Sequence, residues 1–210
     1  MVQVIQASNL SLHDLETRFA LQRVQERQFF PEWRGELPAL TDCARIWLDS
    51  IKTDFLGLAR HPPHEEVVKM VVLSPLLSIA GFYRDAFLPV AEKHVELAFE
   101  AGDETIRGRV DLLVLHQQLC AIAIESKRKG LDVLEALPQA LFYMLTNPQA
   151  ADPTFGLATN GHHFVFLKLV KQATPHYALS NLFSLINDGN DLYTVAGILK
   201  RLATQVSETV

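Results

Sequence analysis

Asp111, Glu125 and Lys127 are the side chains in this sequence whose types and spacing are best suited to chemistry. All three lie in otherwise apolar segments, Ile106–Leu115 and Ala121–Lys127, where an isolated charge is costly to bury. Val, Ile and Leu dominate both segments, which predicts two neighbouring strands. Two carboxylates and an ammonium in such strands need a partner or a function.

The register of the two expected strands brings these groups together. A hairpin that turns about Gln118 places Asp111 opposite Glu125, and the two-residue period of a strand puts Lys127 on the same face. Facing carboxylates are costly unless a positive charge lies between them, and Mg²⁺ meets that need. The expected metal ligands are Asp111, Glu125 and the main-chain carbonyl of Ser126.

A divalent ion at this position suits phosphodiester hydrolysis, because it would lower the pKa of a bound water and neutralise charge on a phosphoryl group. Lys127 could orient the attacking water, help to deprotonate it, or stabilise the charge of the transition state. The alternative interpretation is a cross-strand salt bridge without chemistry. From these residues alone, the two interpretations are about equally supported, because Glu-x-Lys is a common pattern.

The hydrophobic periodicity predicts the elements that hold these residues, in the order helix, strands, helix, strands, helix. The region 1–60 reads as helical and contains a helix capped by Thr41; Pro63 opens the next helix, which is expected to reach Leu77. Three strands follow, then a helix and a hairpin with Asn160-Gly161 at its turn. The expected ranges are 94–99, 106–115 and 119–127 for the strands, 134–146 for the helix, 154–159 and 163–169 for the hairpin, and 181–186 and 191–206 for C-terminal helices.

Over about residues 63–169, the sequence resembles the PD-(D/E)xK superfamily of restriction-endonuclease-like nucleases. More closely, it resembles the N-terminal nuclease domain of type I restriction enzyme R subunits and short stand-alone bacterial, particularly cyanobacterial, proteins of that kind. The resemblance implies an α/β fold with an αβββαβ core and a mixed central sheet, flanked by N- and C-terminal helices. The matching positions are Glu65 on the first helix, Asp111, Glu125 and Lys127 on the strands, and Gln139 and Tyr143 on the next helix.

The resemblance further implies a nuclease that uses Mg²⁺, with Mn²⁺ as a substitute, and acts on nucleic acid, in first place DNA. Glu65 would assist the metal site directly or through water, and Gln139 would support it. The choice of Glu65 over Glu66 rests on spacing alone, and Val110 stands where the family name has Pro. The expected phosphate contacts are Arg107, Arg109, Lys129 and Tyr143. These basic groups could equally pair with nearby acids.

Two interpretations of function therefore compete. The first is the metal-dependent nuclease, expected as a homodimer that cuts both strands of a duplex. The second is a catalytically silent module with the same fold that binds nucleic acid or protein. An intact Glu-x-Lys favours the enzyme. The sequence shows no helicase motor or target-recognition region, which favours a partner protein that supplies specificity.

Composition limits the classes of function. The 210 residues are 49% hydrophobic and carry a formal net charge of −5, typical of one globular domain, 1–210, with the nuclease-like core at 61–170 and C-terminal helices in 171–210. No apolar stretch approaches about 18 residues and no secretory signal follows Met1, so a cytoplasmic protein without a membrane partner is expected. Residues 107–129 nevertheless carry five bases and two acids, so the predicted site is locally basic.

Overall fold

The computed structural model describes residues 3–58, 60–61, 63–84, 87–99, 104–116, 119–126, 132–146 and 150–208. In the N-terminal half the elements are β1 (Gln3–Gln6), the 3₁₀ turn η1 (Ala7–Asn9), α1 (Leu12–Phe19), β2 (Gln22–Arg23), α2 (Asp42–Leu58), α3 (Glu65–Val68), the π-helical turn η2 (Lys69–Leu73), α4 (Ser74–Ala80) and β3 (Phe87–Phe99). They are followed by β4 (Glu104–His116), β5 (Leu119–Ser126), the 3₁₀ turn η3 (Val133–Ala136), α5 (Leu137–Thr146), β6 (Ala150–Thr159), β7 (His163–Val170), β8 (His176–Leu179), β9 (Phe183–Ser184) and α6 (Leu192–Glu208).

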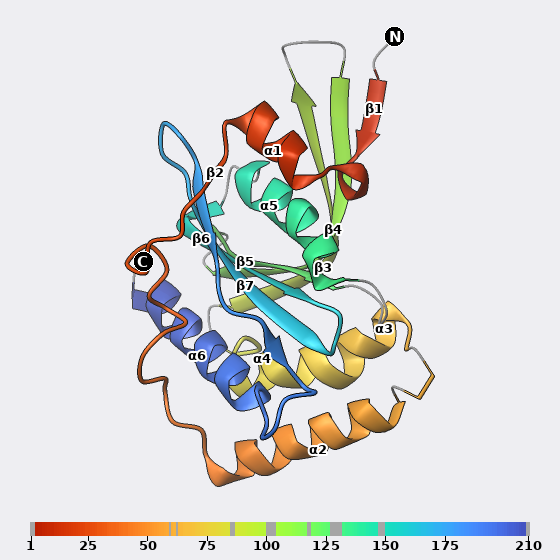
Figure 1. Ribbon diagram of the computed structural model, residues 1–210, viewed down its shortest axis with the longest axis vertical. Coiled ribbons are helices and arrows are strands. Elements are labelled where there is room, and N and C mark those ends of the chain that lie inside the picture. The colour runs from red at the N-terminus through yellow and green to blue at the C-terminus, as the bar shows by residue number, and fades with distance from the viewer. Residues whose placement is uncertain are drawn as a thin grey trace.

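The strands form a mixed sheet in the order β1-β4-β5-β6-β7-β8-β2, with β3 also paired to β4 and β9 to β7 (Figure 1). Antiparallel pairing joins β3, β4 and β5, and β6, β7 and β8. Between these groups β5 and β6 are parallel, as a strand–helix–strand crossover through α5 requires. The helix formed by α3 and α4, the strands β3–β5, the helix α5 and the strand β6 give the αβββαβ order. The predicted α/β fold with a mixed sheet is therefore confirmed.

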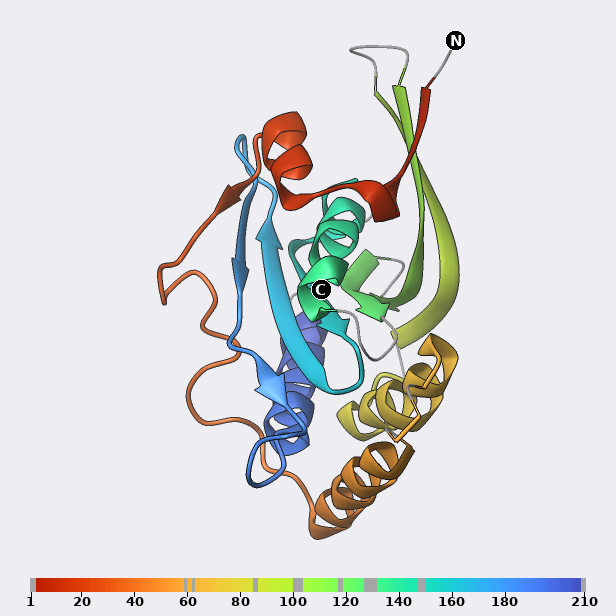
Figure 2. The ribbon, with the colours of Figure 1, turned by 45° about the vertical axis from the view of Figure 1, so that its right-hand side comes forward.

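Helices cover both faces of the sheet, and each face has its own core. On β7, Phe164 and Phe166 belong to the core shared with α2, α4 and α6, whereas Val165 and Leu167 belong to the core shared with α1 and α5. Figure 2 shows α2 and the α3–α4 helix gathered at one end of the molecule and α1 with α5 toward the other. Burial of both faces explains why β7 reads as a continuous apolar run.

The helix predicted after Pro63 is present as α3, η2 and α4 in succession, and it begins at Glu65. Its middle is widened because Pro75, at the start of α4, lacks the N–H that would bond four residues back. In η2 the N–H of Ser74 instead donates to the carbonyl of Lys69, five residues earlier. Such π turns are frequent at functional sites.

The prediction of helical structure is wrong in part for two regions. The N-terminal region 1–60 contains the strands β1 and β2, which pair in parallel with β4 and β8. The expected helix over 181–186 is replaced by β9, which pairs with β7, while the N–H of Ser184 donates to Asp191 Oδ2 at 2.8 Å. In each case, hydrogen bonds to a distant part of the chain outweigh the local helical pattern.

The β6–β7 hairpin is confirmed, and its tip is packed inside the protein. Asn160 Oδ1 accepts from the N–H groups of His162 (3.1 Å) and His163 (2.8 Å), which closes the turn. Gly161 has a φ of +81°, and a Cβ built on it would lie 2.8 Å from Phe55 Cε2 on α2. Only glycine meets both conditions without strain.

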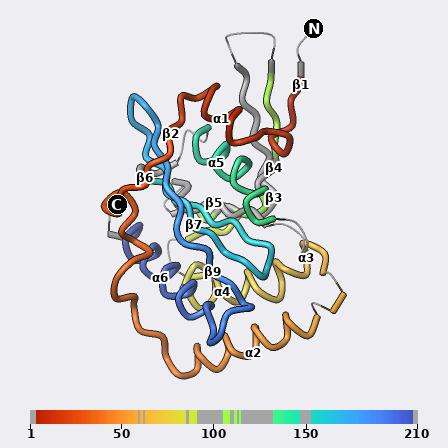
Figure 3. The backbone as a smooth tube through the Cα atoms, in the orientation of Figure 1, coloured from red at the N-terminus to blue at the C-terminus, as the bar shows by residue number. Residues whose placement is uncertain are grey.

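The long connection from β2 to α2 runs along α6 (Figure 3). The guanidinium of Arg201 on α6 donates to the carbonyls of Glu32 at 3.0 Å and Arg34 at 2.6 Å, and the ammonium of Lys168 on β7 pairs with Glu32 Oε1 at 2.5 Å. These contacts order a segment without regular structure. Within the described ranges, none of the helices combines the length and the apolar character that crossing a membrane requires.

Candidate active site

A β-bulge sets the register of the strands that carry the predicted site. Near the tip of the β4–β5 hairpin, Leu115 pairs with Cys120, whereas farther along Leu112 pairs with Ile124, so the register shifts by one residue. The β5–β6 pairing is irregular at the same place, between Cys120 and Ile122. A one-residue shift matters because it exchanges the two faces of a strand.

Beyond the Leu112–Ile124 pair, the next residues along the two strands are Asp111 and Glu125. Without the bulge, the register at the tip would set Asp111 against Ile124 instead. The backbone register therefore agrees with the one inferred from the sequence, but it is reached through a bulge that the sequence did not reveal. The side chain of Glu125 lies outside the described residues.

Asp111 lies where β4 exchanges one neighbouring strand for another. Residues 112–116 pair with β5, and residues 104–107 pair with β1. Ile106 belongs to the core beside α5, whereas Leu112, of the same strand parity, packs against the core on the opposite face. The strand must therefore rotate about its axis between them, a strong form of the usual twist. Asp111 lies in this rotated stretch.

The carboxylate of Asp111 meets Lys69 from the π turn η2. Lys69 Nζ lies 3.2 Å from Asp111 Oδ1 and 2.9 Å from Glu65 Oε1, and the Asp111 side chain is only 7% exposed. Burial lowers the pKa of Lys69. The hydrogen bonds to Glu65 and Asp111 and the negative charges of both carboxylates outweigh this effect, so the pKa is raised overall. The ammonium is therefore firmly charged and joins two carboxylates that are 46 positions apart in the chain.

Sequence reasoning missed Lys69 as part of this cluster. The available signal was its spacing of four residues from Glu65, which places both side chains on one face of a helix. The structure also distinguishes the two candidate helix carboxylates. Glu65 shares Lys69 with Asp111, whereas Glu66 is exposed to solvent.

Gln139 and Tyr143 lie on α5 and are buried, with exposed fractions of 8% and 1%. Gln139 Nε2 donates to the Tyr143 hydroxyl at 3.4 Å, a long hydrogen bond. A Cβ built on Gly108 of β4 would lie 2.7 Å from Tyr143 Oη, so glycine is what permits this close approach. The pair thus packs against β4 three residues before Asp111. Its support of a metal or a phosphate stays a prediction.

The remaining predicted residues are only partly described. Lys127 and Lys129 lie outside the described residues, as do the side chains of Arg109 and Ser126. The backbone of Ser126 pairs with β6, and Arg107 is exposed on the part of β4 that pairs with β1. In the described part of the chain, no three His, Cys, Asp or Glu side chains form a group that could hold a metal. The expected set of two carboxylates and a carbonyl stays a prediction.

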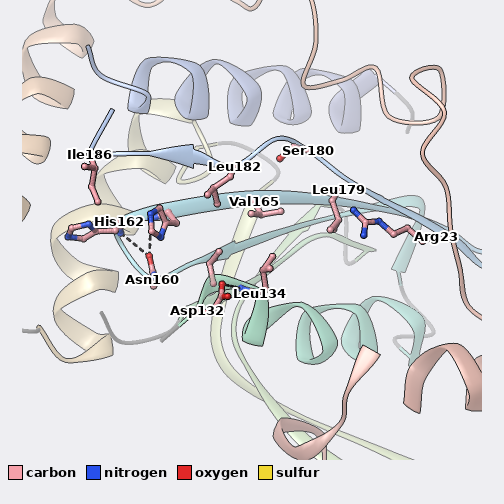
Figure 4. Close-up of a pocket in the computed structure, with 12 residues that line it drawn as sticks. Arg23, Asp132, Leu134, Asn160, His162, Val165, Leu179, Ser180, Leu182 and Ile186 are labelled. Carbon is pink, nitrogen blue, oxygen red and sulfur yellow. Dashed lines mark hydrogen bonds between the residues drawn. The ribbon is translucent and has the colours of Figure 1, made fainter. Parts of the chain in front are cut away.

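A cavity of about 900 Å³ lies along the β6–β7 hairpin. It is lined by Asn160 and His162 at the hairpin tip, by Val165 and Leu179 on β7 and β8, and by Arg23 on β2. Figure 4 shows the histidine and asparagine side chains together at one end and Arg23 at the other. None of the described residues that line this cavity is a predicted site residue.

The protein is partly similar to a solved structure, but not to a protein family or a curated protein. No protein-family model and no curated protein matches the sequence. Among solved structures, a fragment assigned to the HsdR subunit of a type I restriction enzyme from Vibrio vulnificus is similar, with a TM-score of 0.43 and 19% sequence identity. The match covers 70% of this chain and 27% of that chain, so the present protein spans about a quarter of its length. A likeness of this size does not establish a shared activity.

Proposed function

We propose that this protein is a Mg²⁺-dependent nuclease that hydrolyses phosphodiester bonds, in first place those of DNA. Asp111, Glu125 and the carbonyl of Ser126 hold the ion, Glu65 assists, and Lys127 acts on the attacking water. The observation that carries the proposal is the cation position between Asp111 and Glu65, next to the backbone position of Glu125.

The residues fit a hard divalent cation. Two carboxylate oxygens from different elements converge on one nitrogen at 2.9 and 3.2 Å, which supports a site built to hold positive charge. Mg²⁺ prefers such oxygen ligands and keeps several waters. When bound, the ion would supply a water of lowered pKa and would neutralise phosphoryl charge. The chain itself would orient the water through Lys127 and keep the Asp111 carboxylate in place through the surrounding β strands.

The silent binding module stays the second candidate, because Lys69 already pairs with both Asp111 and Glu65 without any metal. In that case the three groups are a structural ion-pair network. The two candidates differ in whether a divalent ion binds at all.

Calorimetric titration of the full chain with Mg²⁺ and with Mn²⁺ tests the first step. We expect binding of either ion, accompanied by a rise of the melting temperature, because an ion that binds only the folded state stabilises it. The double variant Glu125→Ala, Lys127→Ala should lose both effects. Absence of binding and of any thermal shift in the wild type would favour the silent module.

Replacement of Lys69 by methionine should have opposite effects on the protein without and with metal. Without metal the free energy of unfolding should fall by about 1–3 kcal/mol, because the poorly exposed Asp111 carboxylate loses its charged partner. With metal the dissociation constant of Mg²⁺ should fall about tenfold, a change of about 1.4 kcal/mol, since the Lys69 ammonium then no longer competes for the carboxylates. Urea unfolding and calorimetry measure the two quantities.

Lys69→Arg, which keeps the positive charge, is the control and should retain most of the stability.

Because the pKa of Lys69 is raised, the stability from its protonated form is fully present below the ordinary value of 10.5 and is lost as pH rises through the raised value. A weaker affinity for Mg²⁺ in Lys69→Met would show that Lys69 supports the ion instead of competing with it.

A further inference from the structure

A cavity of about 400 Å³ opens directly beside the Asp111–Lys69 pair, between the α3–α4 helix and β4. Its apolar lining includes the buried Leu73 and Leu77 and the partly buried Leu112. Met70 and Tyr83 also line it and are unusually exposed for their type, at 72% and 48%. Large apolar groups exposed together around a cavity are typical of a binding site.

Among the described residues of the lining, the charged groups belong to one pair. Lys69 and Asp111 contribute the ammonium and the carboxylate of the candidate active site. Elsewhere the lining has the hydroxyl of Tyr83, which donates to Ser74 Oγ at 3.0 Å and so holds the aromatic ring in position. A ligand that fits this distribution is flat and largely apolar in one part. Its other part is a phosphate next to the Asp111–Lys69 pair, where the Mg²⁺ of the proposed function would neutralise its charge.

We infer that this cavity binds a single unstacked nucleobase of the strand whose phosphate lies at Asp111 and Lys69. The inference rests on the proposed nuclease function and names its substrate class, a nucleic acid with unpaired nucleotides. The cavity volume suits one nucleotide-sized group, not a duplex. Tyr83 supplies a ring on which a base of any identity can stack, and the apolar side chains cover its other surfaces.

The inference makes single strands the preferred ligand. In a duplex the base must first leave the stack, which costs free energy that an unpaired base does not pay. The π turn η2 contributes to this arrangement, because Lys69, Met70 and Leu73, all within η2, line the cavity.

Binding of a short fluorescent oligonucleotide with 2-aminopurine at its centre tests this inference on the full chain, with Ca²⁺ in place of Mg²⁺ so that an ion is present while cleavage is prevented. We expect the wild type to bind the single strand at least tenfold more tightly than the matching duplex and to change the 2-aminopurine fluorescence. Tyr83→Ala should weaken binding of the single strand about five- to tenfold, the range expected for one stacked base. Tyr83→Phe keeps the ring and should bind like the wild type.

One matched control and one further cavity variant separate this cavity from general surface effects. Trp47→Ala removes another exposed aromatic side chain, on α2 and outside the cavity lining, and should leave binding unchanged. Met70→Glu places a negative charge at an exposed lining position and should weaken binding without affecting the core. Circular dichroism and melting curves establish that each variant is folded.

The outcomes distinguish this inference from the nuclease proposal. Equal affinity for single strand and duplex, unaffected by Tyr83→Ala, overturns the base-binding cavity, even if metal binding and cleavage are observed. Tyr83-dependent binding of single strands by a protein that binds no metal leaves the cavity standing and overturns the nuclease. A wild type that binds no nucleic acid overturns both.

Discussion

Asp111→Asn should reduce the rate of Mg²⁺-dependent DNA cleavage about 10³-fold while the protein stays folded. Asparagine has nearly the shape of aspartate but lacks its charge, and a metal-held transition state loses several kcal/mol when a charged ligand is removed. A loss of about 4 kcal/mol corresponds to about 10³-fold in rate. The measurement is single-turnover cleavage of supercoiled and linear DNA, with calorimetry for the ion.

Asp54→Asn is the matched control, since it removes one exposed carboxylate from α2 and leaves the candidate site intact. It should cleave like the wild type. Cleavage that persists unchanged in Asp111→Asn would mean that another site, or a contaminating enzyme, is responsible. Replacement of Asp111 also leaves Lys69 with Glu65 as its remaining partner in this cluster, so the melting temperature without metal should fall.

Gly161→Ala should destabilise the protein by about 2–5 kcal/mol, the largest effect on folding that we expect from adding one methyl group. The φ of +81° costs an L-residue about 1–2 kcal/mol. The new Cβ would also lie 2.8 Å from Phe55 Cε2 and 3.1 Å from Val68 Cγ1, and forcing extra atoms into a packed core costs about 1–3 kcal/mol. Urea unfolding monitored by tryptophan fluorescence measures the difference.

Two other glycines separate the contributions. Gly189 has a φ of +77° and no atom within 4 Å of an added Cβ, so Gly189→Ala reports the backbone cost alone. Gly57 lies in α2 with equally open surroundings, and Gly57→Ala should stabilise the helix slightly. If Gly161→Ala costs no more than Gly189→Ala, the hairpin tip is not packed against α2 as described.

The sequence was sufficient to predict a helix or strand where the pattern that defines it lies within a short stretch of chain. The apolar runs of β4 and β5, the Asn160-Gly161 turn and the long amphipathic pattern of α6 each lie within a short stretch of chain. It was not sufficient for β1 and β9, because a short strand is defined by its partner. Gln3 pairs with Glu104, about a hundred residues away, and nothing in the local pattern around Gln3 indicates that.

In the candidate site too, the sequence predicted what depends on neighbouring residues and missed what depends on distant ones. Asp111 was recognisable because a carboxylate inside an apolar strand is costly, and that argument needs only its neighbours. The role of Lys69 depends on the α3–α4 helix crossing β4 at one place, and on Pro75 widening the helix there. Pro75 is visible in the sequence, but the crossing is not a property of the residues near Lys69. Tertiary contacts between distant elements therefore supplied what the sequence pattern lacked.

The bulge beside Ala121 has a mechanical consequence for the hairpin. Toward the tip the two strands follow one register, and toward Asp111 they follow another, where β5 is held by β4 on one edge and by β6 on the other. The backbone positions of Asp111 and Glu125 are thus fixed relative to each other by the pairing of β5 with both neighbouring strands, and not by the length of the turn. A change in the length of the turn would therefore alter the pairing at the tip and leave the register beside Asp111 unchanged.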